Sequence, residues 1–532
     1  MEHSFIQLHD LPNEILMMIF KKLTNIVILY SLAGIHKRLN QIVYDSTFTN
    51  HLSLMISMSN GYINPLLDPI IDQFCLRILP KIHHKIKWLD LESSSMERIL
   101  LTTTYPNLTG LGLYNIHEET FTNLFMDEDH FTRTFKNQIL SLIIDINTNG
   151  QHNVSEDMIS IIFTYTFTTF TNLEYLKFGS SSIICPRLSF YILSPFIISS
   201  NLLELHVDLE YFTDCLYLCD GRFNQLHTLD VNILRIQCSN LIINNAQKLP
   251  KLKYFSLFCG NDTYAYDELI LPLLHRMSNL EKLYLYVLIY GRESFIDGNE
   301  MNSNIINHMP YLNTFTFNIY SFIHFNYQIN LLSNEDIQNS FKNFKYNEVI
   351  SCVDYFPKTE IGQCHIYSYP YQLEHYDTIT NNFPGGIFTC VHRILLFDER
   401  PFENEFFLQI SRSFPFLQKL TVVNRKRQNN KAFRTQNNAN ENISIIRYPH
   451  LTELDLTAAH IDYVKQFFFD TKTCLPNNVF LIIDYQLMKK TTRNFRRNLT
   501  RSNCAKLNCI LFYRKLTFPE HFQDYFPHTN IL

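Results

Sequence analysis

Two cysteine pairs are the residues of this sequence whose spacing comes nearest to a metal site. Three residues separate Cys215 from Cys219, and four separate Cys504 from Cys509. Thiolates at such spacings hold structural zinc when a second pair of cysteines or histidines completes the tetrahedron. Neither pair has such a partner at finger spacing, and both lie in apolar, strand-like segments. We therefore predict buried free thiols and no metal.

The other reactive residue types lack the contexts that catalysis or cofactor binding requires. His83 and His84 have no glutamate at metalloprotease spacing, and we expect an exposed loop there. The acidic run of residues 127–130 lacks the alternating oxygen ligands and central glycine of a calcium loop, and indicates a solvated turn. The sequence contains no phosphate loop and no nucleophile elbow. We predict no cofactor and no enzymatic activity; the one enzymatic alternative is a hydrolase within the irregular region 321–400.

Two basic clusters could make electrostatic contacts. Arg425, Lys426 and Arg427 lie in a polar, asparagine-rich stretch, residues 424–443, which we predict to be a mobile loop. The second cluster has roughly helical spacing and comprises Lys489, Lys490, Arg493, Arg496, Arg497 and Arg501. Either cluster fits a nuclear-import signal or a patch for an anionic partner, and the plainer alternative is a solvated helix face.

The composition excludes several classes of protein. A chain of 532 residues indicates two or three domains, or a small domain followed by a repeat array. The net charge of −5 provides no basic field for nucleic acid or a lipid surface. The 12 cysteines show no repeated pairing, and the sequence has neither a signal-peptide pattern nor an apolar run long enough to span a bilayer. We expect an intracellular protein, cytoplasmic or nuclear, that binds no nucleic acid and no membrane.

The N-terminal segment predicts a helix with an unusually wide apolar surface. Pro12 suits a first helical turn, Asp10 is a plausible cap, and Glu14 complements the helix dipole. Apolar side chains then recur at spacings of three and four, at Ile15, Leu16, Ile19, Phe20 and Leu23. They cover more of the circumference than one core-facing stripe requires, so this helix needs a partner.

Two further amphipathic segments follow, over residues 26–32 and 35–43, with Gly34 and the basic pair Lys37 and Arg38 near their junction. Three helices in about fifty residues cannot bury this apolar surface alone. The order Leu-Pro-x-Glu-Ile, Ile-Phe-x-x-Leu, Leu-x-x-Leu and Lys-Arg-Leu resembles the F-box, over roughly residues 5–50.

The F-box resemblance implies docking on the Skp adaptor and, through it, on the cullin of SCF ubiquitin ligases. The adaptor-binding residues that it implies by position are Leu11, Pro12, Ile15, Ile19, Phe20 and Leu23. The sequence departs from the usual pattern at Ile35 and His36, where Val-Cys is common, and has Phe48 near the place of the closing Trp. The alternative is that these helices only cap a larger domain.

A short phrase, Leu-x-x-Leu-x-Leu, recurs along the rest of the chain. Its copies are Ile86/Leu89/Leu91, Leu108/Leu111/Leu113, Ile139/Leu142/Ile144, Leu173/Leu176/Phe178, Leu202/Leu205/Val207, Leu226/Leu229/Val231, Leu252/Phe255/Leu257, Leu280/Leu283/Leu285, Leu312/Phe315/Phe317, Val391/Ile394/Leu396, Leu417/Leu420/Val422 and Leu451/Leu454/Leu456. Clear central copies are about 22 to 34 residues apart, which is typical of a solenoid. Because the last two apolar residues of each phrase alternate with a polar one, each phrase predicts a short strand with one buried face.

Helical segments lie between the phrases, for example at residues 155–170, 267–277, 299–309, 404–413 and 461–470. Right-handed crossovers would stack the strands in parallel on one side and the helices on the other. This unit resembles a leucine-rich repeat, although the asparagine ladder of that family is missing. The predicted fold class is therefore α/β: a three-helix F-box followed by an irregular leucine-rich-repeat solenoid, with parallel strands on the concave side and helices on the convex side.

The predicted domain order follows from these patterns. Residues 1–50 form the F-box, residues 51–80 a linker or helical connector, residues 81–500 the solenoid, and residues 501–532 a C-terminal cap. Within the solenoid, residues 321–360 are expected to be an insertion that includes a capped helix in the stretch SNEDIQNSFKNF.

Repeat geometry also predicts a binding face, because the residues beside the last two apolar positions of each phrase point off the sheet. Aromatic residues at these positions are typical of the hot spots that contribute most of the binding energy to a protein partner. The predicted target-binding residues are Tyr114, Tyr175, Tyr254, Phe258, Tyr284 and Tyr286, joined by the charged side chains Lys177, His206, Asp208, Asp230 and Asp455. We expect a non-catalytic substrate receptor of an SCF ligase that binds an unknown target protein; the alternative is a repeat scaffold outside any ligase.

Overall fold

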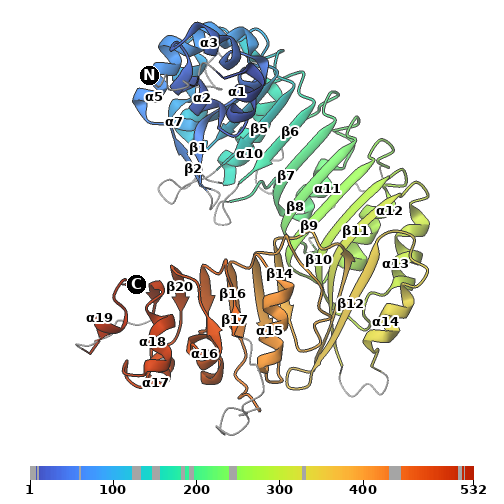
Figure 1. The fold of residues 1–532 in the computed structure, drawn as a ribbon. Helices are drawn as coiled ribbons and strands as arrows, with labels where there is room; N and C mark the ends of the chain where they lie inside the picture. The colour runs from blue at the N-terminus through green and yellow to red at the C-terminus, as the bar shows by residue number, and fades with distance from the viewer. Residues whose placement is uncertain are drawn as a thin grey trace. The chain divides into compact units, whose positions relative to one another are not determined.

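The computed structural model describes residues 8, 11–58, 62–122, 134–146, 156–180, 186–190, 197–238, 248–325, 331–429, 445–512, 518–519 and 522–532. The fold is α/β with mostly parallel strands, as predicted (Figure 1). The chain divides into two compact units. Unit 1 is Met1–Ile289 with Asn302–Phe315, and unit 2 is Tyr290–Met301 with Thr316–Leu532.

Four short helices open unit 1: α1 (Asn13–Phe20), α2 (Asn25–Leu32), α3 (Lys37–Val43) and α4 (Ser46–Thr49). The three predicted amphipathic segments are therefore helical. Thr24, His36 and Asp45 cap the last three of these helices, because each side chain accepts a hydrogen bond from a first-turn backbone N–H. Pro12 takes the cap position of α1 without a side-chain bond, and the predicted cap Asp10 lies outside the described residues.

The main sheet of unit 1 has the strand order β10-β9-β8-β7-β6-β5-β4-β3-β1-β2. The bounds are β1 (His51–Ser57), β2 (Ile63–Pro65), β3 (Trp88–Glu92), β4 (Gly110–Tyr114), β5 (Ser141–Asp145), β6 (Tyr175–Gly179), β7 (Glu204–Tyr211), β8 (Thr228–Arg235), β9 (Tyr254–Thr263) and β10 (Lys282–Arg292). Only the short edge pair β1 and β2 is antiparallel among these.

The repeated phrases supply β3 to β10, which confirms the prediction of a strand at each of these phrases. All three apolar residues of every phrase are buried. A shared hydrogen-bond pattern sets the register: the Lys87 carbonyl accepts from Thr109 N and Gly110 N, at 3.0 and 2.9 Å, and the Leu140 carbonyl accepts in the same way from Glu174 N and Tyr175 N. Each strand thus starts at a fixed place on its neighbour, and the apolar rows line up across the sheet.

Helices cover the face of the sheet to which these apolar rows point. They include α7 (Ser93–Leu100), α8 (Glu118–Phe121), α10 (Glu156–Thr169), α11 (Phe212–Leu218) and the π-helical turn Tyr266–Ile270 with α12 (Leu271–His275). The Phe163 ring of α10, for example, lies 5.1 Å from the ring of Phe178 in β6. Figure 1 shows α11 and α12 along one side of the strands. The opposite face of the sheet, which we call the open face, carries the remaining side chains.

Residues 51–80 differ from the predicted connector. The strand β1 pairs in parallel with β3, with His51 opposite Trp88 and Leu54 opposite Leu91, so this segment belongs to the sheet. Helices α5 (Asp68–Gln73) and α6 (Leu79–Ile82) follow on either side of the π-helical turn Phe74–Ile78. The segment therefore contains the helices that the prediction allowed, and in addition a strand pairing that joins segments far apart in the sequence.

Unit 2 contains an antiparallel pair where the repeat spacing fails. The strands β12 (Glu348–Phe356) and β13 (Ile361–Tyr369) form a hairpin, and β13 also pairs antiparallel with β11 (Thr314–His324). The predicted capped helix is α14 (Asn334–Ser340), and Ser333 and Asp336 form a capping box at its start. The region predicted as an insertion, residues 321–360, thus contains the predicted capped helix and most of a hairpin that extends to Tyr369.

A second sheet in unit 2 is parallel throughout, in the order β14-β15-β16-β18-β20-β21-β22. Its strands are β14 (His375–Ile379), β15 (Arg393–Phe397), β16 (Lys419–Val423), β18 (Glu453–Asp455), β20 (Val479–Ile482), β21 (Leu507–Leu511) and β22 (Asn530–Ile531). The helices between them are α15 (Asn404–Ser413), α16 (Ile461–Phe468), α17 (Tyr485–Thr491), α18 (Asn498–Cys504) and α19 (Phe522–Tyr525). A small parallel pair, β17 (Ile446–Arg447) and β19 (Thr473–Cys474), completes the unit.

The second basic cluster is not one helix. Helix α17 ends at Thr491, and Arg493, Asn494 and Phe495 follow in the left-handed region with φ of 51°, 59° and 62°. Helix α18 begins only at Asn498. The prediction of helical spacing was wrong here, because three consecutive left-handed residues turn the chain between two short helices. Of the predicted loop 424–443, residues 430–443 lie outside the described residues.

Among the residues that the structure describes, no helix has the length and apolar character needed to cross a membrane.

Candidate functional site

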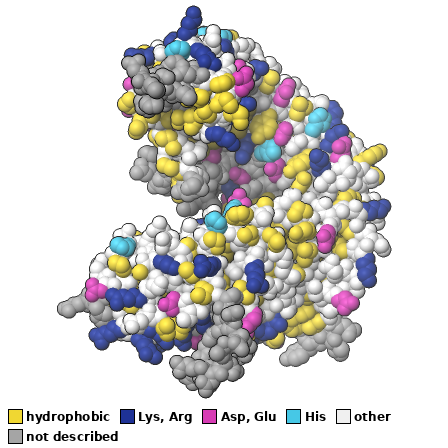
Figure 2. Space-filling view, in the orientation of Figure 1, with side chains coloured by type: hydrophobic (Ala, Val, Ile, Leu, Met, Phe, Trp, Pro, Cys, Tyr) yellow, Lys and Arg dark blue, Asp and Glu magenta, His cyan; other side chains and the backbone are white. Residues whose placement is uncertain are grey.

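Five of the six predicted adaptor-binding residues reach the surface of the N-terminal helices. Pro12, Ile15, Ile19 and Leu23 are exposed, and Leu11 is half-buried. Figure 2 shows hydrophobic side chains gathered over these helices. Exposed apolar patches on folded proteins are typical of interaction sites.

Phe20 is the exception, and the prediction for it was wrong. Its side chain is only 1% exposed and lies in the core, with its ring 6.2 Å from that of Phe48 in an edge-to-face arrangement. Leu16 is buried as well. These two residues form the inward stripe of α1, and Ile15 and Ile19 lie on its outward side.

Three further exposed apolar residues lie on or beside these helices and were not among the predicted contacts. Met18 is 66% exposed, Ile35 is 67% exposed, and Val27 is exposed on α2. The sequence indicated such additional exposed residues, because the first helix has more apolar residues than one core-facing stripe requires. We call the set Leu11, Pro12, Ile15, Met18, Ile19, Leu23, Val27 and Ile35 the apolar surface.

Polar contacts fix the geometry of this surface. The Arg38 guanidinium donates to the Leu11 carbonyl and to Asn13 Oδ1, each at 2.9 Å, and so ties α3 to the start of α1. Gly34 has a φ of +91°, which favours glycine, and its N–H donates to Asn40 Oδ1 at 2.7 Å. Asn25 Nδ2 donates to the His51 carbonyl at 2.9 Å and links α2 to the sheet.

The open face of the unit 1 sheet carries the predicted target-binding residues, but not as one cluster. Tyr254 and Tyr284 have ring centroids 5.2 Å apart, and Phe258 and Tyr286 stack at 4.4 Å. These four residues, on β9 and β10, form what we call the aromatic platform. Tyr175 on β6 instead packs against His206, and Tyr114 lies on β4. With strands about 4.8 Å apart, Tyr114 is roughly 24 Å from the platform.

A polar network lies on β7 and β8, between Tyr175 and the platform. His206 Nε2 lies 2.7 Å from Glu204 Oε1, and Nδ1 lies 3.0 Å from Asp230 Oδ2. The hydrogen bond to Asp230 is the main cause that raises the pKa of His206; burial opposes it, and the bond to Glu204 adds to it. The network therefore favours a charged imidazole between two carboxylates.

A pocket of about 330 Å³ opens on the same face, lined by residues that include Tyr114, Asp145, Lys177, His206 and Asp208. Asp208 accepts hydrogen bonds from Ser180 N at 3.0 Å and Asn232 Nδ2 at 2.8 Å. Burial is the main cause that raises the pKa of this carboxyl group. The carboxylate lies where a Cβ would stand on Gly179, so glycine is required beside it.

The register gives the charge balance of the open face. The charged residues at its positions between β3 and β10 include the acidic Asp90, Glu92, Asp145, Glu204, Asp208, Glu210 and Asp230, and the basic Lys177, His206 and Lys282. The face is therefore acidic as well as aromatic.

Trp88 and Asp90 on β3 are part of this face, although the sequence patterns did not single them out. Trp88 Nε1 donates to Asp90 Oδ1 at 2.6 Å, and Ser53 Oγ donates to Asp90 Oδ2 at 2.6 Å. The Trp88 ring covers Gly110 and the Asp90 carboxylate covers Gly112, at distances that leave no room for a Cβ. In the sequence, the two alternating glycines of β4 could have indicated that large side chains of the neighbouring strand cover this position.

The cysteine pairs occupy apolar surroundings. Cys215, Cys219 and Cys504 are buried, and Cys509 is half-buried. Burial raises the pKa of the Cys504 thiol, and the hydrogen bond with Cys219 followed by burial raises that of Cys215. Within the described parts of the chain, no group of three or more His, Cys, Asp or Glu side chains could hold a metal ion. The acidic run 127–130 lies outside the described residues.

The region proposed as an alternative hydrolase contains two buried carboxylates, Asp354 and Asp398. Asp354 accepts from Thr380 Oγ1 at 2.7 Å, and Asp398 accepts from Asn381 N at 2.9 Å. Arg400 lies 3.2 Å from Asp398 and 3.6 Å from Asp354. Because neighbouring groups satisfy both carboxylates, we interpret this cluster as a structural tie between β12 and the β15 end.

No protein-family model matches this sequence, and a search of curated proteins finds no match.

Proposed function

We propose that this protein is a non-catalytic substrate receptor of an SCF-type ubiquitin ligase. In this proposal the N-terminal helices are an F-box that docks on the Skp adaptor, and the strands that follow form an irregular leucine-rich-repeat-like solenoid that binds a target protein. The observation that carries the proposal is the apolar surface on α1 and α2. Apart from the half-buried Leu11, its residues are exposed, although Leu16 and Phe20 already fill the core beneath them.

The solenoid part of the proposal rests on the repeated phrase. Within unit 1, parallel strands from β3 to β10 follow one another in chain order, each in register with the next. Stacking of one strand and one crossover per repeat is the behaviour of repeat proteins. The parallel sheet of unit 2 supports a second run of the same kind.

The proposed mechanism is proximity. The apolar surface holds the adaptor, and the acidic, aromatic open face holds the target, so that target lysines experience a high effective concentration of the ubiquitin-charged enzyme. No acid, base or nucleophile of this chain takes part, which fits a protein without enzymatic activity. Such a receptor would be intracellular, cytoplasmic or nuclear.

Co-purification of the full chain with the Skp adaptor tests the proposal. The native chain is expected to retain the adaptor, whereas Leu11→Ala/Pro12→Ala and Ile15→Asp are expected to lose it. A matched control is Leu101→Asp at the end of α7, since Leu101 is 54% exposed but lies outside the apolar surface. If the native chain does not bind the adaptor under conditions in which a known F-box binds it, the ligase assignment is wrong and the scaffold alternative replaces it.

A further inference from the structure

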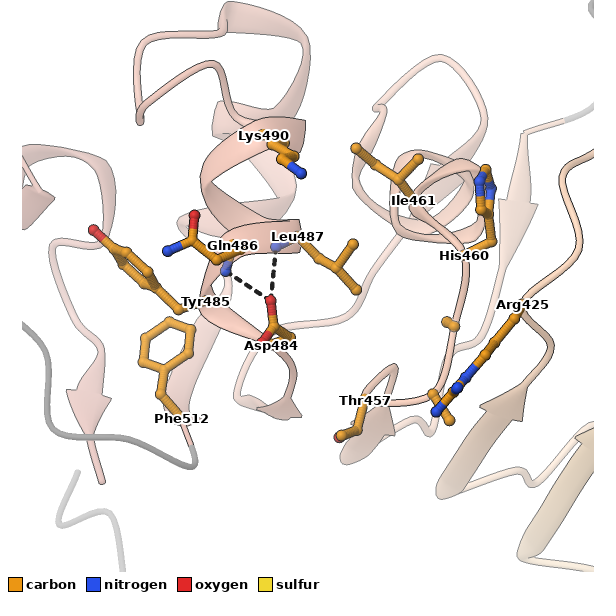
Figure 3. A pocket seen from close by; sticks show the side chains of 12 residues that line it. Arg425, Thr457, His460, Ile461, Asp484, Tyr485, Gln486, Leu487, Lys490 and Phe512 are labelled. Atoms are coloured by element: carbon orange, nitrogen blue, oxygen red, sulfur yellow. Dashed lines mark hydrogen bonds between the residues drawn. The ribbon is translucent and has the colours of Figure 1, made fainter.

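The two basic clusters meet at one pocket of unit 2. The pocket has a volume of about 630 Å³, and its lining includes Arg425 from the first cluster and Lys490 from the second. In Figure 3, Arg425, Thr457 and His460 come from one wall, and Asp484, Leu487 and Lys490 from the other. The fold thus joins two sequence features that looked unrelated.

The strand order explains why residues from both basic clusters line one pocket. The lining residues follow the ends of four successive parallel strands: Arg425 comes after β16, Thr457–Ile461 after β18, Asp484–Lys490 after β20, and Phe512 after β21. In a parallel sheet these carboxyl ends share one edge, so the loops that leave them converge there. This edge is where ligands of parallel α/β sheets commonly bind.

The charges of the lining favour an anion. Arg425 and Lys490 are exposed, and within the described residues neither side chain has a hydrogen-bond or ion-pair partner. The acidic lining residue, Asp484, already accepts hydrogen bonds from Gln486 N at 2.8 Å and Leu487 N at 3.1 Å. Figure 2 shows further Lys and Arg side chains over this C-terminal part of the chain. An incoming anion therefore meets two unpaired cations and one occupied carboxylate.

The remainder of the lining is apolar or aromatic. The rings of Tyr485 and Phe512 lie 5.5 Å apart in an edge-to-face arrangement, and Ile461 and Leu487 add aliphatic surface. A bare inorganic anion would leave this wall uncovered. The volume suits a drug-sized ligand rather than a single ion.

From these observations we propose that this pocket binds a phosphate monoester carried on an aromatic or apolar body, with Arg425 and Lys490 supplying the positive charge of the lining and its aromatic and aliphatic residues contacting the body. The site goes beyond the proposed ligase function and does not depend on it, because the apolar surface belongs to unit 1 and this pocket to unit 2.

Isothermal titration calorimetry tests the proposal by measuring the dissociation constant of phenyl phosphate for the full chain. The native chain is expected to bind phenyl phosphate saturably and more tightly than inorganic phosphate. Arg425→Gln/Lys490→Gln is expected to weaken binding at least about tenfold. The matched control Arg427→Gln/Arg496→Gln removes the same charge from exposed residues outside the lining, and is expected to leave the affinity within about twofold. Asp484→Asn keeps a helix-capping side chain and is expected to tighten binding.

The proposal is overturned if the native chain shows no saturable binding at millimolar phenyl phosphate, or if the lining and control variants weaken binding equally. Circular dichroism of each variant verifies that it is folded. Adenosine monophosphate and a phosphotyrosine tripeptide then separate a free metabolite from a modified protein as the source of the phosphate. Preference for either one supports the site, and binding of neither contradicts it.

Discussion

The Arg38 guanidinium donates a hydrogen bond of 2.9 Å to the backbone carbonyl oxygen of Leu11. It joins the third helix to the residue that begins the apolar surface, and Asn13 receives a second bond from the same group. A planar guanidinium can serve two acceptors at once, which a lysine ammonium does less well.

Replacing Arg38 therefore tests whether this contact holds the apolar surface in place. Arg38→Ala is expected to destabilise the N-terminal helices by about 1–2 kcal/mol, because hydrogen bonds to a charged donor are lost. Hydrogen exchange at the amides of Leu16 and Phe20 should accelerate accordingly. In Arg38→Lys, the exchange rates of these amides should lie between those of the native protein and those of Arg38→Ala. Unchanged exchange in Arg38→Ala would show that the contact is dispensable.

Phe20 and Ile19 are adjacent but should behave in opposite ways. Phe20→Ala removes a ring from the core and is expected to lower the free energy of unfolding by about 3–5 kcal/mol. Ile19→Ala shortens an exposed side chain and is expected to change it by less than about 0.5 kcal/mol. Denaturant titration followed by circular dichroism measures both. Equal losses would mean that the assignment of the inward and outward sides of α1 is wrong.

The glycines of β4 can be tested through Trp88, the only tryptophan of the chain. Gly110→Ala places a methyl group where the indole ring lies, so the ring must move away from the sheet and from Asp90. The expected result is a red shift of the fluorescence emission. Gly260→Ala is the control, since its Cβ would meet only the Phe258 ring at an ordinary 3.5 Å. An unshifted spectrum in Gly110→Ala would contradict the packing.

The pH dependence of stability should report the network around His206. Since Asp230, and to a smaller extent Glu204, raise the pKa of this residue in the folded protein, folding favours its protonated form. The stabilisation is complete below the unfolded-state pKa of about 6.5 and is lost as the pH rises through the folded value. The native protein is therefore expected to melt at a higher temperature than His206→Gln. This difference in melting temperature should be largest at pH 5.5–6.5 and should decrease toward pH 8. A difference that is constant with pH would contradict the network.

The strands were predictable because their pattern is local. In the phrase from Leu226 to Val231, for example, alternation alone determines which side chains point inward, and the same holds for every copy. The helix α14 was predictable for the same reason, since Ser333 and Asp336 mark its start within four residues.

What could not be predicted depends on contacts between distant segments. The pattern of α1 did not distinguish Phe20 from Ile19, because apolar residues surround most of that helix and Phe48 decides which side is buried. The left-handed turn at Arg493 and Phe495 has no local signal, since neither residue type favours that conformation. The pairing of β1 with β3 and the presence of Arg425 and Lys490 in the lining of one pocket both arise from the stacking of whole repeats.

The dissociation constant of the full chain for the Skp adaptor, measured by biolayer interferometry, tests the proposed function most directly. The native chain and Leu101→Asp are expected to bind with equal affinity, and Ile19→Asp is expected to bind at least about a hundredfold more weakly, because it buries an unpaired charge in the contact. Equal binding by Ile19→Asp and Leu101→Asp, or no binding by the native chain, would contradict the assignment of these helices as the adaptor site.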